Sequence, residues 1–205
     1  MKYGKIILKL TLIFTSIYLL AGCAKAPDTE LSTAQAAIKA ALDVESDKYM
    51  ARNFLNLETA FKAAQDEITL QKNTFFLRRK YTRAQQLLQN VTDLATEIKN
   101  ETPKAKQEMT ELVENNLPIV KDMVKSTGQS IKAASRRKNK NLIAALNVDL
   151  TIADSVVDSA LVNFKAGKIY NASENLLKAQ DILMQINDKL NNDSEEITFT
   201  AVEVR

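Results

Sequence analysis

The residue types that carry most enzyme chemistry are scarce in this sequence of 205 residues. Histidine is absent, and cysteine occurs once, at Cys23. A Ser-His-Asp triad, a histidine-ligated zinc site and an internal disulfide are therefore excluded. Carboxylates are paired at Asp154 and Asp158 and at Glu195 and Glu196, but neighbouring acids are common on solvated helix surfaces. We expect a protein that is not an enzyme and has no metal or cofactor site.

Two groups of basic residues remain as candidates for binding. The larger group has no intervening acid and consists of Lys132, Arg136, Arg137, Lys138 and Lys140; the smaller consists of Arg78, Arg79, Lys80 and Arg83. A basic residue near an anionic membrane contributes about 1 kcal/mol. The larger group is therefore a candidate contact for anionic lipid headgroups, lipopolysaccharide or cell wall. The alternative is a solvated connection whose positive charge complements a helix C-terminus.

The start of the chain has the order of an export signal. Three lysines, at positions 2, 5 and 9, accompany an apolar stretch at 6–20, and small residues follow. The sequence Leu20-Ala21-Gly22-Cys23 resembles the lipobox of bacterial lipoproteins. That resemblance implies cleavage between Gly22 and Cys23 and a lipid on the Cys23 thiol. The alternative is an uncleaved anchor, but the apolar core is shorter than the roughly 20 residues that span a bilayer.

The lipobox also predicts a location in the bacterial cell envelope, because two or more acyl chains anchor a protein stably. Ala24 stands where an aspartate would signal retention in the inner membrane. The expected site is therefore the periplasmic face of the outer membrane; in a Gram-positive cell it would be the outer face of the single membrane. Loss of residues 1–22 removes three of the 28 basic residues and none of the 25 acidic ones. The mature chain is thus neutral overall, which argues against a nucleic-acid partner.

Apolar residues in the mature chain recur at alternating steps of three and four, the spacing of helices that pack along one narrow seam. Four such seams are present: Met50, Phe54, Leu57, Phe61, Ala64 and Ile68; Leu77, Tyr81, Ala84, Leu88, Val91, Ala95 and Ile98; Ile143, Leu146, Leu150, Ala153, Val157, Ala160 and Phe164; Ala172, Leu176, Ala179, Leu183, Ile186 and Leu190. These seams predict an all-α fold, an elongated antiparallel bundle of helical hairpins with tetratricopeptide-like packing.

The seams and the few breakers divide the chain into segments. Residues 23–28 form a lipidated tether, 29–100 one helical domain, 101–192 further hairpins, and 193–205 a tail. The predicted helices cover 29–45 with Asp28 or Thr29 as N-cap, 48–71, 75–99, a fourth that starts near Pro103 and breaks or kinks at Pro118, 141–166 with Gly167 as C-cap, and 170–190. Apolar residues alternate at 196–205, so the tail is predicted to be strand-like or disordered.

Part of the first domain has a family likeness. The alanine-rich stretch 31–42, Lys48-Tyr49-Met50-Ala51, Leu57-Glu58-Thr59-Ala60 and the segment 80–88 (Lys-Tyr-Thr-Arg-Ala-Gln-Gln-Leu-Leu) resemble a family of envelope lipoproteins known as domain of unknown function 4398. Arg52 stands where that family usually has proline. The resemblance covers residues 28–98 and implies helical structure without implying an activity.

The predicted function follows from the anchor and the helices. We expect a lipid-anchored structural or interaction module whose helix grooves hold an unidentified envelope protein. Binding of anionic headgroups or cell wall through the larger basic group is the alternative, and a periplasmic chaperone is a weaker one.

Overall fold

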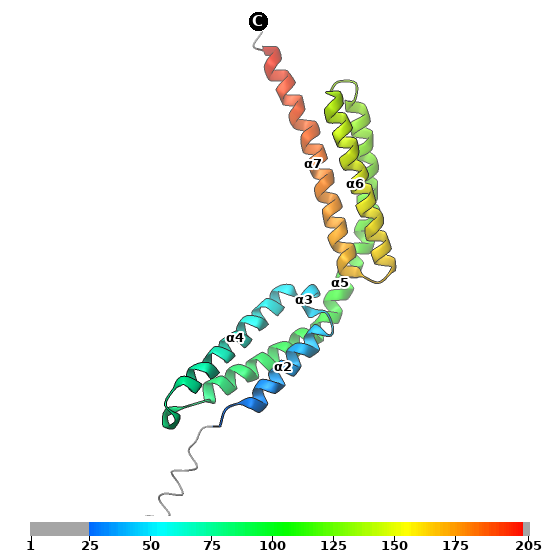
Figure 1. The fold of residues 1–205 in the computed structure, drawn as a ribbon. Coiled ribbons are helices and arrows are strands. Elements are labelled where there is room, and N and C mark those ends of the chain that lie inside the picture. Colours follow the sequence, from blue (N-terminus) through cyan, green and yellow to red (C-terminus); the bar gives the residue numbers. More distant parts are fainter. Residues whose placement is uncertain (1–24, 203–205) are drawn as a thin grey trace, which may run out of the picture. The chain divides into compact units, whose positions relative to one another are not determined.

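The computed structural model describes residues 25–202, and only the backbone of 193–202. Its elements are α2 (Asp28–Leu42), α3 (Ser46–Tyr49), α4 (Ala51–Asn73), the 3-10 turn η1 (Phe76–Arg78), α5 (Thr82–Ala134), α6 (Lys140–Lys165) and α7 (Ile169–Val202) (Figure 1). Strands are absent from this part of the chain. The prediction of an all-α fold built from packed helices is confirmed.

The chain divides into two compact units, which meet between Pro103 and Lys104. Unit 1 contains α2, α3, α4 and the first part of α5, and unit 2 contains the rest of α5 with α6 and α7. The predicted domains instead divided the chain between residues 100 and 101. Each unit has buried apolar residues of its own.

Unit 1 is a three-helix bundle in which α4 runs against α2 and α5 (Figure 1). Gln85 Nε2 in the first turn of α5 donates to Glu30 Oε1 in the first turn of α2, at 2.9 Å. The hydroxyls of Ser46 and Thr102 lie 2.7 Å apart, near the other end of the unit. These two contacts fix α2 and α5 as parallel, so both helices begin at the same end of unit 1.

The core of unit 1 follows the predicted seams. Its buried residues are Ala34, Ala41, Phe54, Leu57, Ala64, Ile68, Tyr81, Ala84, Leu88, Val91, Ala95 and Ile98. Five of these twelve are alanines, and they let the three backbones approach closely enough for the larger side chains to interlock. Met50 and Phe61 lie half-buried against this core. Leu77 is the exception, since it is exposed.

The turn between α2 and α3 depends on one residue in the left-handed region. Glu45 has φ 64° and is the N-cap of α3. Its carboxylate accepts a hydrogen bond from Lys48 Nζ at 2.8 Å. This hydrogen bond, and then the negative charge of Glu45, raise the pKa of Lys48 above its ordinary value of 10.5. The predicted side-chain N-cap at Asp28 or Thr29 is wrong, because Pro27 occupies the N-cap of α2 and makes no such bond.

Unit 2 packs α6 against α7 and the second part of α5 (Figure 1). Its core consists of Val113, Val120, Ile131, Leu146, Ala153, Val157, Ala160, Ile169, Ala172, Leu176, Ala179, Leu183, Ile186 and Leu190. Ile143, Leu150 and Phe164 of the third predicted seam are half-buried. A Cβ at Gly128 would lie 3.2 Å from Leu150 Cδ2, so α5 and α6 approach closely there.

The C-cap of α6 is Ala166, one residue before the predicted Gly167, and Gly167 supplies the left-handed residue that follows it. Gly167 has φ +72° and donates its N–H to Phe164 O at 3.0 Å, and Lys168 N donates to Asn163 O at 2.9 Å. This pair of hydrogen bonds is a Schellman motif, which satisfies the last carbonyls of α6 and reverses the chain into α7.

The predicted separation of the third and fourth helices is wrong, because α5 is one helix of 53 residues. Pro103 and Pro118 lie inside it, and both are exposed. A proline removes one intrahelical hydrogen bond and crowds the carbonyl four residues earlier. Those carbonyls belong to Lys99 and Glu114, which are exposed residues, so water can solvate them. The predicted break therefore overestimated the effect of an exposed proline.

Two further predictions of boundaries are wrong. The third helix was expected to begin at Phe75, but η1 intervenes and α5 begins at Thr82. The tail was expected to be strand-like or disordered, but α7 continues to Val202. A single strand needs a neighbour for its backbone hydrogen bonds, whereas a helix pairs its own N–H and C=O groups. The last residues of the predicted tail, 203–205, lie outside the described chain.

Candidate functional site

The predicted lipidation site, Gly22 and Cys23, lies outside the described residues. The described chain begins at Lys25, which is exposed, and Ala26 already packs against the core of unit 1. Pro27 is fully buried, and its carbonyl accepts the N–H of Leu31 at 2.9 Å to open α2. The described chain is therefore fixed to the bundle from Ala26 onward, three residues after Cys23.

The larger basic group surrounds the connection between α5 and α6. Lys132 lies in the last turn of α5, and Arg136, Arg137 and Lys138 follow its final residue, Ala134. Asn139 Oδ1 then accepts the N–H of Asn141 at 2.8 Å, and Lys140 is the first residue of α6. All five basic residues are exposed except Lys138, which is half-buried. These positive charges lie next to the C-terminus of α5, where they interact favourably with the helix dipole.

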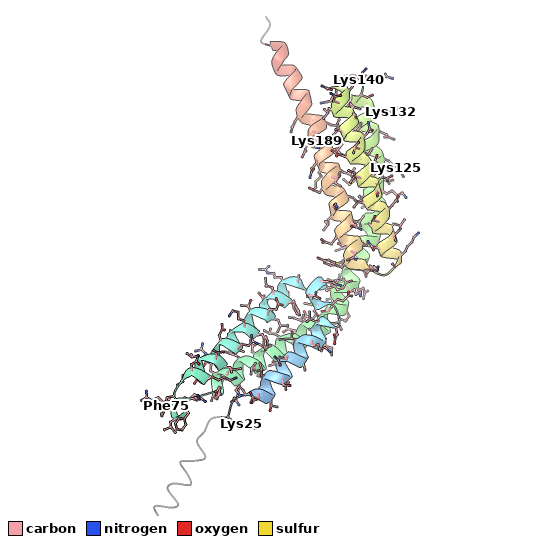
Figure 2. All side chains as sticks on the ribbon, in the orientation of Figure 1. Lys25, Phe75, Lys125, Lys132, Lys140 and Lys189 are labelled. Carbon is pink, nitrogen blue, oxygen red and sulfur yellow. The ribbon has the colours of Figure 1, made fainter. Side chains whose placement is uncertain are left out.

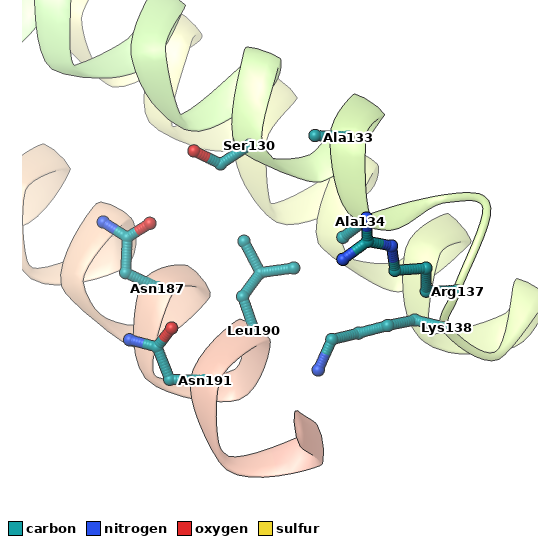
Figure 3. A pocket seen from close by; sticks show the side chains of 8 residues that line it. All are labelled: Ser130, Ala133, Ala134, Arg137, Lys138, Asn187, Leu190 and Asn191. Atoms are coloured by element: carbon teal, nitrogen blue, oxygen red, sulfur yellow. The ribbon is translucent and has the colours of Figure 1, made fainter. Parts of the chain in front are cut away.

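A cleft of about 600 Å³ lies beside this connection, between the end of α5 and α7 (Figure 3). Arg137 and Lys138 line one side of it, and the amides of Asn187 and Asn191 line the other, with Leu190 between them (Figure 3). Two of the five predicted basic residues thus face a concave polar surface, and Lys132, Arg136 and Lys140 do not line it.

The smaller basic group is divided by its contacts. The guanidinium of Arg79 donates from Nε to Thr74 O at 3.0 Å and from Nη2 to Lys72 O at 2.8 Å, so it closes the C-terminus of α4. Arg83 pairs with Glu67, with Nε 3.7 Å from Oε2. Arg78 and Lys80 are exposed, and their side chains make no ion pair with the described residues.

The outer face of α6 carries an exposed seam that sequence analysis did not find. It steps by four and three through Val148, Ile152, Ser155, Ser159 and Val162. These positions lie opposite the buried residues of α6, and Val148, Ile152 and Val162 are 60%, 47% and 65% exposed. We call this set the α6 outer seam. Once the core seam of α6 is assigned, the apolar residues Val148 and Ile152, four apart on the opposite side of the helix, are a signal for it.

Unit 1 offers a shallower surface between α2 and α4. A groove of about 350 Å³ is lined by Gln35, Ile38, Lys39, Leu42, Glu58, Phe61, Lys62 and Gln65. Its floor is apolar and its edges carry charges of both signs. Such a groove can accept part of an amphipathic segment, as predicted for the helix grooves of this chain, but its charges select no particular partner.

The carboxylates considered for chemistry are not gathered into a site. Asp154 and Asp158 are exposed on α6, and the side chains of Glu195 and Glu196 lie outside the described residues. Within residues 25–192, no three carboxylate, cysteine or histidine side chains are grouped so that they could hold a metal ion. None of the described helices has both the length and the apolar character needed to cross a membrane.

Comparison with known proteins identifies no relative: no protein family, curated protein or solved structure matches this chain. The resemblance to the lipobox and to the family of unknown function therefore remains a prediction from the residues.

Proposed function

We propose that this protein is a lipid-anchored module of the bacterial cell envelope that binds a partner helix on the α6 outer seam. The lipobox motif at Leu20 to Cys23 supports the anchor. The exposed 3-4 spacing of Val148, Ile152 and Val162 is the observation that carries the binding role. A helix that has already buried one seam has no structural need for apolar residues on the opposite side.

The chemistry of the α6 outer seam indicates what would bind there. Two serines, Ser155 and Ser159, lie between the apolar side chains, and the Ser159 hydroxyl turns back to donate from Oγ to the backbone O of Ser155 at 2.9 Å. Small residues let a second helix approach closely. Asp154 and Asp158 flank the seam on one side. The matching partner is an amphipathic helix with an apolar seam and basic residues beside it.

Site-specific crosslinking in cells tests this proposal. A photoreactive amino acid at Ile152 is expected to give one defined adduct, whereas the same probe at Leu177, which is 58% exposed on α7 of the same unit, gives little. Val148→Asp is expected to weaken an adduct formed from position 162 by roughly tenfold or more, because burying one valine is worth about 1.5 kcal/mol or more. Mass spectrometry identifies the adduct. A dimer of this chain, or equal adducts from positions 152 and 177, would contradict the proposal.

A second function, binding of anionic groups at the α5–α6 connection, is favoured by the cleft that Arg137 and Lys138 line with two amides. Guanidinium and amide donors together suit phosphate oxygens. The test replaces Arg136, Arg137, Lys138 and Lys140 with serine and measures binding to vesicles containing phosphatidylglycerol or lipid A, and to isolated cell wall. Unchanged binding to all three would reject this function.

A further inference from the structure

Three consecutive large apolar residues are exposed at the tip of the hairpin that joins α4 and α5. Phe75, Phe76 and Leu77 are 61%, 49% and 66% exposed. The two phenylalanine rings contact each other edge to face, with centroids 4.8 Å apart. We call these three residues the apolar tip; Figure 2 labels Phe75 at this end of unit 1. Burying these three side chains would be favourable, since each Å² of apolar surface removed from water contributes roughly 25 cal/mol of free energy.

The apolar tip is held in place by polar contacts behind it. Arg79 binds the carbonyls of Lys72 and Thr74. Gln71 Oε1 accepts the N–H of Lys80 at 2.8 Å, and its Nε2 donates to Glu67 Oε1 at 2.9 Å. These bonds close the loop on both sides of residues 75–77. The chain therefore presents the three apolar side chains outward from a braced loop.

The surroundings of the apolar tip are basic. The sequence contains no acidic residue between Glu67 and Asp93. Lys72, Arg78 and Lys80 are exposed next to the tip and make no ion pair with the described residues. Asp28 and Glu30, in the first turn of α2, and Glu67 of α4 are acids at the same end of unit 1. Glu30 accepts a hydrogen bond from Gln85, and Glu67 accepts one from Gln71 and pairs with Arg83. At an anionic membrane, apolar side chains enter the interfacial region and basic residues bind the headgroups. The apolar tip with its neighbouring basic residues suits such a surface.

The described chain begins at this end of unit 1. Figure 2 shows Lys25 near the end that carries Phe75, and the bond from Gln85 to Glu30 confirms that α2 and α5 begin there. Cys23 is two residues before Lys25, so its Cα lies within about 7 Å of that of Lys25. A lipid on Cys23 would thus hold this end of unit 1 against the bilayer.

We propose that the apolar tip inserts into the interfacial layer of the membrane that holds the lipid anchor, with Lys72, Arg78 and Lys80 on the anionic headgroups. The proposal rests on the proposed anchor only for bringing the tip to the membrane. The tip and the anchor together make two attachments at one end of unit 1, so this unit stands on the membrane in a fixed orientation.

Fluorescence quenching on vesicles tests the insertion. The protein is the lipidated mature chain, carrying Leu77→Cys and labelled there with an environment-sensitive fluorophore. It is reconstituted into vesicles of phosphatidylethanolamine and phosphatidylglycerol that contain spin-labelled lipids. Leu55→Cys is the matched control, because Leu55 is 62% exposed on α4 of the same unit. Quenching at position 77 is expected to exceed quenching at position 55 several-fold. Equal quenching at the two positions would overturn the proposal.

Two further variants separate insertion from other causes. In the Leu77→Cys background, Phe75→Ser with Phe76→Ser is expected to reduce quenching to the level at position 55 while the helical circular dichroism stays unchanged. Quenching that survives this change would overturn the proposal. A blue shift of the fluorophore's emission that grows with protein concentration in detergent would also overturn it, because it would show that the tip contacts a second copy of the chain.

The labelling itself reports on the anchor, because Cys23 is the natural chain's one cysteine. An acylated Cys23 has no free thiol, so mass spectrometry is expected to find one fluorophore per chain. Two fluorophores would show that Cys23 is not acylated, which contradicts the proposed anchor. The Leu77→Cys protein with Cys23→Ser, which takes one fluorophore, would then be added to preformed vesicles. Quenching at position 77 would still support insertion of the tip, and its absence would overturn it.

Discussion

At the scale of single residues, Ser46 and Thr102 form a hydroxyl pair inside unit 1. Thr102 Oγ1 donates to Ile98 O at 2.7 Å, so its own hydrogen is used and the Ser46 hydroxyl donates to it. We predict that Ser46→Ala costs about 1 kcal/mol, whereas Thr102→Val costs about 1–3 kcal/mol because it leaves a buried hydroxyl without a partner. In the Thr102→Val background, Ser46→Ala should be neutral or stabilising. Urea unfolding measures all four proteins, and additive losses would show that the hydroxyls act independently.

Glu45 tests a different residue-scale term, the cost of the left-handed backbone. Both Glu45→Ala and Glu45→Gly remove the ion pair with Lys48, but only glycine adopts φ 64° without a Cβ clash. We predict that the glycine variant is more stable than the alanine variant by about 1 kcal/mol. Thermal unfolding of the two variants gives the comparison directly. Equal stabilities would mean that this turn does not hold a left-handed residue in solution.

At the scale of helices, the proline inside the second part of α5 should reduce stability. Pro118→Ala supplies an N–H that can pair with Glu114 O and relieves the crowding of that carbonyl. Since proline also restricts the unfolded chain, the net gain is expected to be about 2 kcal/mol. Chemical unfolding of the full chain is the measurement, with exposed Asn115→Ala as a control that should change stability by less than about 0.5 kcal/mol. A loss of stability at Pro118→Ala would show that unit 2 needs the proline.

A substitution in the Schellman motif at the end of α6 should lower stability, in contrast to Pro118→Ala. Gly167→Ala places a Cβ on a residue with φ +72°, although nothing lies within 4 Å of the new atom. The cost therefore comes from the left-handed backbone conformation and not from a clash with neighbouring atoms. We predict that the free energy of unfolding falls by about 1 kcal/mol. Exposed Lys168→Ala is the control, because it keeps the N–H that bonds to Asn163. An unchanged unfolding midpoint for Gly167→Ala would contradict the motif.

These helices show what the spacing of residues can predict. Seams at steps of three and four identified nearly every core residue from Phe54 to Ile98 and from Leu146 to Leu190, because burial is a property of one helix face. Leu77 fits the same spacing yet is exposed, since Arg79 ends α4 by taking the carbonyls of Lys72 and Thr74. No local pattern encodes that contact. The sequence likewise did not predict that α5 is one continuous helix, because this depends on the solvation of the carbonyls of Lys99 and Glu114.

The candidate surfaces were predicted less completely than the core. Sequence analysis named the larger basic group, and the structure adds that Arg137 and Lys138 face a cleft against α7. It did not find the α6 outer seam or the apolar tip, because a surface becomes recognisable only after the core has been assigned. Val148 and Phe75 are ordinary apolar residues until burial elsewhere shows that they have no structural partner inside the bundle.

At the scale of the whole molecule, charge is arranged locally rather than globally. Removal of residues 1–22, which the lipobox resemblance predicts, would take away three of the 28 basic residues and none of the 25 acidic ones, so the numbers would balance. Positive charge nevertheless gathers at the apolar tip in unit 1 and at the α5–α6 connection in unit 2, while Asp154 and Asp158 lie beside the α6 outer seam. A neutral protein with such patches is suited to several weak contacts with different surfaces.

The proposed lipid anchor would bring those contacts to a membrane. We predict that Cys23→Ala abolishes incorporation of labelled palmitate and leaves a precursor that retains residues 1–22, because the lipobox resemblance places the diacylglyceryl group on the Cys23 thiol and the cleavage directly before that cysteine. Lys25→Ser, which leaves the motif intact, should be labelled and processed normally. Ala24→Asp is expected to be labelled as well but to move from the outer to the inner membrane fraction on a density gradient. Equal palmitate labelling of the wild-type protein and Cys23→Ala would contradict the anchor, and an unmoved Ala24→Asp would contradict the predicted outer-membrane location.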